Sequence, residues 1–95
     1  MKDELIREEL GERLDDLQCE NLFLIQNPAK FCFGIDAVLL ANFIKAKRGG
    51  HAVDLCTGSG IVPVLLSAKT QAKKITGIEI QEDIAEMANR SVKYN

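Results

Sequence analysis

The clearest structural signal in this chain of 95 residues is Val53-Asp54-Leu55-Cys56-Thr57-Gly58-Ser59-Gly60. It begins as a short apolar strand over residues 52–55, which only Asp54 interrupts, and it ends in a turn with two glycines. Glycine permits a positive φ, and it lets a ligand approach the backbone where a Cβ would block it. An apolar helix is predicted to follow over residues 61–69. Pro63 is tolerated there because the amide hydrogens of a first helical turn are unpaired in any case.

A second strand and a second helix are predicted after this unit. Residues 74–80 form an apolar run with Glu79 near its end, and residues 82–94 are amphipathic. The inner side of that last helix is expected to carry Ile84, Ala85, Met87, Ala88 and Val92. Strand, turn, helix, strand and helix in this order indicate a right-handed βαβ unit with one more helix, and such crossovers build parallel sheets. We therefore expect an α/β fold.

The spacing of two carboxylates around the turn favours a nucleoside pocket. Glu79 follows Gly60 by nineteen residues and closes the second strand, where a carboxylate can accept hydrogen bonds from both ribose hydroxyls. The amide hydrogens at the start of the helix would face the same ligand. S-adenosylmethionine has no phosphates, but it needs a turn for its methionine part, an acidic residue near its amino group and a ribose carboxylate. Asp54 and Glu79 suit the two acidic roles.

The sequence supports or excludes other interpretations of the turn to different degrees. A dinucleotide site requires a third glycine, and Pro63 stands in that place. A Walker-type phosphate loop is excluded because no Gly-Lys-Ser/Thr follows. A turn with two glycines is by itself equally compatible with a structural connection. Cys56 is interpreted as a packed small residue and not as a nucleophile, because no base or cation lies near it in sequence.

The first third of the chain is predicted to lead into this domain. Residues 2–17 are highly charged, with leucines and an isoleucine three or four apart, which indicates a helix that Gly11 interrupts. Residues 22–26 read as a strand before the turn Asn27-Pro28, and residues 34–47 as a helix. One face of that helix carries the apolar residues Ile35, Val38, Leu39, Phe43 and Ile44. At least one of Phe31 and Phe33 is expected in the core.

Composition narrows the class of protein. Hydrophobic residues make up 46% of the chain and charged residues 27%, and the net charge of −2 gives no general attraction to nucleic acid or membranes. Two basic clusters are interpreted as solvated helix ends in preference to binding patches: Lys45, Lys47 and Arg48, and Lys69, Lys73 and Lys74. Three widely spaced cysteines and one histidine argue against a metal site or disulfides, and the thiols are expected to be reduced and mostly buried. Without a signal peptide or a membrane-spanning run, we expect a soluble cytoplasmic protein.

The residues around the turn resemble a known family. The run from Asp54 through Thr57-Gly58-Ser59-Gly60 to Pro63 is similar to the first motif of class I S-adenosylmethionine-dependent methyltransferases, in the form typical of the small-domain group that methylates amino nitrogens. The segments Glu12-Arg-Leu-Asp-Asp-Leu-Gln18 and Phe31-Cys-Phe-Gly-Ile-Asp-Ala-Val-Leu-Leu40 are similar to the lead-in of bacterial valine-tRNA adenine-N6 methyltransferases. Cys56 departs from the motif, which often has glycine there.

This resemblance implies a Rossmann-like fold and a set of cofactor-binding residues. Asp54 would anchor the amino group of S-adenosylmethionine, Glu79 its ribose, and Ile80 would pack on the adenine. The segment from Phe33 through Gly34 to Asp36 would close over the cofactor. The complete set that the resemblance assigns to the cofactor is Phe33, Gly34, Asp36, Asp54, Thr57, Gly58, Ser59, Gly60, Glu79 and Ile80. No metal ligand and no catalytic residue is assigned.

The family's catalytic Asn-Pro-Pro-Tyr/Phe motif has no counterpart, since Asn27-Pro28-Ala29-Lys30 lacks the second proline and the aromatic residue. We expect residues 1–33 to be a lead-in with a helix and a short strand, and residues 34–95 to be the truncated first part of the domain, with an incomplete parallel sheet. The expected activity of the whole enzyme is methyl transfer to adenine N6 in tRNA. Alternatives are a glutamine N-methyltransferase fragment or a non-catalytic nucleoside-binding or oligomerising module. An incomplete sheet predicts self-association.

Overall fold

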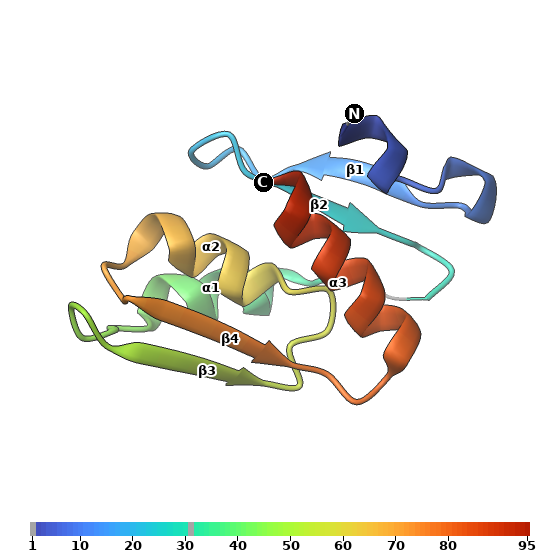
Figure 1. Ribbon diagram of the computed structural model, residues 1–95. Helices are drawn as coiled ribbons and strands as arrows, with labels where there is room; N and C mark the ends of the chain where they lie inside the picture. Colours follow the sequence, from blue (N-terminus) through green and yellow to red (C-terminus); the bar gives the residue numbers. More distant parts are fainter. Residues whose placement is uncertain (1, 31) are drawn as a thin grey trace.

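The chain folds into two small sheets joined by helices, as the computed structural model shows for residues 2–30 and 32–95 (Figure 1). Phe31, one of the two candidate core aromatics, lies outside the described residues. The elements along the chain are the 3₁₀ helices η1 (Lys2–Leu5) and η2 (Glu8–Leu10), strands β1 (Arg13–Asp16) and β2 (Phe23–Gln26), helix α1 (Ile35–Phe43), strand β3 (His51–Leu55), helix α2 (Ile61–Lys69), strand β4 (Lys74–Ile78) and helix α3 (Glu82–Tyr94). Within the described residues, no helix is long and apolar enough to cross a membrane.

Strands β3 and β4 pair in parallel, with His51 opposite Lys74 and Leu55 opposite Ile78. Helix α2 connects them, so the βαβ unit predicted from the sequence is confirmed. Helix α3 follows β4, also as predicted. Glu79 comes directly after the last residue of β4, and Cys56 directly after the last residue of β3. Because both strands run the same way, these two residues lie at the same end of the sheet (Figure 1).

The predicted helix over residues 2–17 is wrong. Two 3₁₀ turns stand at its beginning, and Gly11 then adopts a left-handed conformation with φ of 89°, which ends any helix. The following residues form β1, which pairs antiparallel with β2 from Arg13 opposite Gln26 to Asp16 opposite Phe23. Sequence periodicity favoured a helix, but pairing with the apolar strand β2 decides the local structure. The lead-in is therefore a hairpin that follows two short turns.

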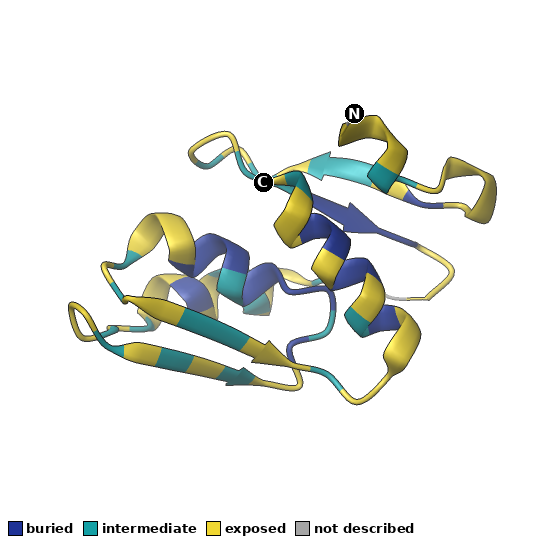
Figure 2. Cartoon of the chain, in the orientation of Figure 1, coloured by how far each residue is buried: buried dark blue, intermediate teal, exposed yellow. Residues whose placement is uncertain are grey.

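Strand β2 joins two hydrophobic clusters. Leu24 and Ile25 are both fully buried, and successive strand residues point to opposite faces. Leu24 packs in the cluster formed by α1 and α2, whereas Ile25 packs with Ile84 and Met87 of α3. Figure 2 shows this division, with buried residues on β2, α2 and the side of α3 that faces the hairpin. Helix α3 is therefore held by the hairpin.

Some residues of the apolar helix faces that the sequence predicts lie at the surface. Ile35, Leu39 and Phe43 of α1 are 77%, 61% and 82% exposed, because α1 packs on α2 through the opposite side, which carries Ala41. Val92 of α3 is also exposed, whereas Ile84, Met87 and Ala88 are buried as expected. The prediction that the thiols are mostly buried is wrong. Cys19 and Cys32 are partly exposed and Cys56 is exposed, and all three are free.

A buried ion pair ties the start of the chain to its end. Arg90 of α3 and Glu12 are 6% and 8% exposed, and the two guanidinium nitrogens donate to both carboxylate oxygens at 2.5 and 2.7 Å. The same guanidinium donates to the backbone oxygen of Leu5 at 2.7 Å, and to the Glu86 carboxylate at 2.7 Å. The hydrogen bonds from Arg90 hold the pKa of Glu12 below its ordinary value.

We predict that Glu12→Gln lowers the free energy of unfolding by about 3 kcal/mol, because it leaves the buried guanidinium without its main counter-charge. The exposed Glu9→Gln is the matched control and is expected to change this free energy by less than about 0.5 kcal/mol. Urea unfolding followed by circular dichroism measures both. Equal changes of the unfolding free energy in the two variants would contradict a stabilising role for the ion pair of Glu12 with Arg90.

The ion pair of Glu12 with Arg90 predicts that the stability of the fold depends on pH. Since the folded-state pKa of Glu12 is lowered, its contribution is present above the unfolded-state pKa and is lost as pH falls through the folded-state pKa. Unfolding free energies measured from pH 7 to pH 3 should therefore fall less steeply in Glu12→Gln than in the wild type. Parallel curves would show that Glu12 does not carry this dependence.

Candidate cofactor site

The turn between β3 and α2 closes onto the end of β4. The amide of Thr57 donates to the backbone oxygen of Ile78 at 2.9 Å, and the amide of Gly60 donates to the backbone oxygen of Thr57 at 3.1 Å. Gly58 and Gly60 adopt φ of 59° and 86°, which glycine takes without strain. The glycines of the turn thus occupy left-handed positions, as the sequence predicted.

Glu79 holds this turn from the neighbouring strand. One carboxylate oxygen accepts a hydrogen bond from the amide of Gly58 at 2.9 Å, and the other accepts from the amide of Gln81 at 3.1 Å. The structure therefore brings together the glycine turn and the acidic residue. A carboxylate oxygen can accept more than one hydrogen bond, so each retains capacity for a ligand hydroxyl.

Asp54 is a second carboxylate at the same end of the sheet. It stands opposite Gly77 in the parallel register, is partly exposed, and forms no hydrogen bond or ion pair with other described residues. Gly77 is a residue whose importance the sequence analysis missed. A Cβ at Gly77 would lie 2.8 Å from the Thr57 hydroxyl oxygen and 2.9 Å from the Thr57 methyl group, so only glycine lets the turn approach β4 this closely. A glycine inside a strand was the available signal.

Two hydroxyl groups of the turn lack partners. The side-chain oxygens of Thr57 and Ser59 are buried, and neither has a hydrogen-bond partner among the described residues. Buried hydroxyls are normally paired, and an unpaired one costs about 1–3 kcal/mol. Helix α2 also begins at Gly60 without a side-chain cap, which leaves first-turn amides available. The turn therefore holds more hydrogen-bonding capacity than the protein itself uses.

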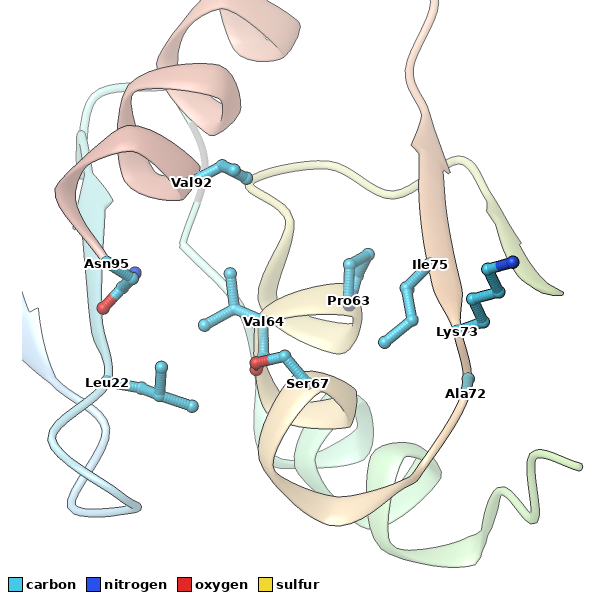
Figure 3. A pocket seen from close by; sticks show the side chains of 9 residues that line it. All are labelled: Leu22, Pro63, Val64, Ser67, Ala72, Lys73, Ile75, Val92 and Asn95. Carbon is cyan, nitrogen blue, oxygen red and sulfur yellow. The ribbon is translucent and has the colours of Figure 1, made fainter. Parts of the chain in front are cut away.

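A hollow lies beside the turn, between α2, β4 and α3. It has a volume of about 350 Å³, and Thr57, Gly60, Gly77 and Glu79 contribute to its wall. A second hollow of about 460 Å³ continues along α2 toward the end of α3 (Figure 3). Its walls are mainly apolar, and none of the predicted cofactor residues lines it. Within the described part of the chain, no group of acidic, histidine or cysteine side chains could hold a metal ion.

The remaining predicted site residues are not linked to the glycine turn by hydrogen bonds among the described residues. Phe33 packs against the core cluster of α1 and α2, so the prediction of a core aromatic is confirmed for this residue. Gly34 caps the start of α1, and Asp36 lies in the exposed first turn of that helix. Among the described residues, no hydrogen bond or ion pair links Asp36 to the glycine turn. Ile80 is 93% exposed beside Glu79. Its packing on an adenine stays a prediction.

The interpretation of Cys56 as a packed residue is wrong. Its side chain is exposed, and its φ of 57° lies in the left-handed region that side-chain-bearing residues rarely adopt. This conformation explains why glycine suits the position. Thr57 forms the buried contact with β4 instead.

Comparisons with known proteins agree with the resemblance drawn from the motif. No protein-family model matches the chain. Over 80 residues it is 22% identical to a tRNA1(Val) (adenine(37)-N6)-methyltransferase of Glaesserella parasuis serovar 5, which covers 84% of this chain and 34% of that protein. Over 86 residues it is 27% identical to the Proteus mirabilis protein of the same name, covering 90% and 34%. The chain spans about a third of the length of these curated relatives, and over most of its own length it resembles tRNA adenine-N6 methyltransferases.

Proposed function

We propose that this chain forms the S-adenosylmethionine-binding part of a Rossmann-like methyltransferase. The observation that carries the proposal is the hydrogen bond between the Glu79 carboxylate and the amide of Gly58, because it fixes a ribose-binding acid against a glycine turn. Unpaired hydroxyls in the turn and a free carboxylate at Asp54 support it, since a nucleoside with an amino-acid tail can use both. The residues present fit this cofactor.

The chain's own groups would bind and orient the cofactor. Glu79 would accept hydrogen bonds from the ribose hydroxyls, and Asp54 would pair with the amino group. Glycine at positions 58 and 60 leaves the backbone accessible, and the start of α2 favours a carboxylate through its dipole. The bound cofactor supplies an activated methyl group. The protein's contribution is to hold that group in line with an incoming nitrogen, a positioning effect that accounts for much of the rate of such reactions.

The proposed methyl acceptor is adenine N6 in tRNA, because both relatives are tRNA1(Val) (adenine(37)-N6)-methyltransferases. A glutamine side-chain nitrogen is the alternative acceptor within the same chemistry. A non-catalytic nucleoside-binding module would show the same cofactor site without any acceptor. Assay of methyl transfer from labelled cofactor, with tRNA and a glutamine-containing protein substrate offered separately, distinguishes these three possibilities, since a non-catalytic module would label neither.

We predict that calorimetric titration detects S-adenosylhomocysteine but not NAD, and that Glu79→Ala weakens binding of S-adenosylhomocysteine about 10- to 100-fold. Hydrogen bonds to a charged group contribute about 1.5–3 kcal/mol, which corresponds to this range. The exposed Glu82→Ala, three residues away, is the matched control and should bind like the wild type. Equal affinity of Glu79→Ala and wild type, or equal binding of NAD, would contradict the proposed site.

We also propose that the chain self-associates through the exposed side of α1. Ile35, Leu39 and Phe43 lie one helical turn apart and are all largely exposed, which forms an apolar stripe. Leu39→Glu is predicted to shift the sedimentation equilibrium toward the 10.5 kDa monomer. Leu10→Glu, at a leucine that is 58% exposed outside this stripe, should leave the equilibrium unchanged. A wild-type chain that is folded and monomeric at high concentration would refute self-association.

A further inference from the structure

The structure gathers both basic clusters of the sequence at one end of the parallel sheet. Three of these residues precede β3. The other three lie in the segment that runs from the last residue of α2 to the first residue of β4. Backbone hydrogen bonds join the two segments: the amide of Gly49 donates to the oxygen of Gln71 at 2.9 Å, and the amide of Lys73 donates to the oxygen of Gly50 at 2.8 Å. All six side chains are exposed. We call this surface the basic end; it consists of Lys45, Lys47, Arg48, Lys69, Lys73 and Lys74.

The charge of the basic end is not neutralised by the protein. Residues 44–51 and 67–75 contain no aspartate or glutamate. None of the six cations takes part in the ion pairs found among the described residues. Six of the chain's 12 lysines and arginines are concentrated here, although the net charge of the chain is −2. The acidic residues therefore lie elsewhere in the molecule. The chain has a strongly positive surface although its net charge is negative.

The residues between the cations indicate which polyanion fits. They are small or polar and include Ala46, Gly50, Thr70 and Gln71. Surfaces that bind anionic membranes combine basic residues with large apolar or aromatic side chains. Residues 44–51 and 67–75 expose no such side chain, and the nearest exposed one in sequence, Phe43, belongs to the apolar stripe of α1 that precedes them. Hydroxyl, amide and backbone N–H groups beside lysine and arginine are typical of contacts to nucleic-acid phosphates.

We propose that the basic end binds the phosphate backbone of a nucleic acid. The assignment to RNA, and not DNA, rests on the proposed function; the phosphate contact does not. Because β3 and β4 are parallel, the basic end lies at the starts of these strands and the candidate cofactor site at their ends. Five strand residues span about 16 Å, so the two surfaces lie roughly this far apart along the strands. The basic end would thus anchor the body of the RNA at a distance from the methyl donor.

Fluorescence anisotropy with a labelled, unmodified valine-tRNA transcript in 50 mM KCl tests the proposal. The charge-reversed variants are Lys47→Glu/Arg48→Glu and Lys73→Glu/Lys74→Glu, all at exposed positions. Each is expected to weaken binding at least about tenfold and to lower the slope of log affinity against log salt by about 2, since each lost phosphate contact removes about one unit. Lys2→Glu/Lys93→Glu makes the same change of charge outside the basic end and should retain affinity within about threefold.

Equal weakening by the control variant would overturn the proposal, as would a folded wild-type chain that does not bind tRNA. Binding to phosphatidylserine vesicles in place of tRNA, lost in the same variants, would overturn it in favour of a membrane surface. Titration with S-adenosylhomocysteine separates this inference from the proposed function. The basic-end variants should keep wild-type affinity for that ligand. Loss of tRNA binding in the basic-end variants supports the phosphate contact even if no variant binds the nucleoside.

Discussion

Parallel pairing of β3 with β4 determines where the candidate cofactor site and the basic end lie. Strands that run the same way place their starts at one end and their finishes at the other. The carboxyl ends of the strands hold the glycine turn, Asp54 and Glu79. Hydrogen bonds from Thr57 to Ile78 and from Gly58 to Glu79 hold the turn against β4. The starting end holds the basic segments. One strand pairing thus separates the proposed nucleoside site, with its two carboxylates, from a positively charged surface.

A second constraint comes from the hairpin that precedes this unit. Leu24 and Ile25 are neighbours on β2, but they belong to different clusters, so the strand attaches α1 and α2 on one side and α3 on the other. The ion pair of Arg90 with Glu12 closes the same arrangement from the beginning of the chain. The position of α3 beside the turn therefore depends on residues far away in sequence. Helix α3 packs closely on the turn, since a Cβ at Gly60 would meet Ala88 of α3 at 3.4 Å.

The sequence predicted the parts of the fold that local patterns determine. The strand, turn and helix around Gly58, the second strand and the last helix were all found where apolar periodicity and turn residues indicated. Residues 13–16 could not be predicted in this way, because their strand exists only through pairing with β2. The exposure of Cys56 depends on a backbone twist that glycine spacing alone does not reveal. The joining of the two basic clusters likewise depends on contacts between Gly49–Gly50 and residues 71–74, which are distant in sequence.

The central claim is that the turn and the end of β4 form one nucleoside site. Amide NMR spectra of the ¹⁵N-labelled chain during titration with S-adenosylhomocysteine test it most directly. We predict that the largest and saturable shifts fall on Gly58, Gly60, Glu79 and Ile80, because the ligand would replace or extend the hydrogen bonds of these groups. Shifts confined to the walls of the second, apolar hollow near Leu22, Ser67 and Asn95, or none in a folded chain, would contradict the claim.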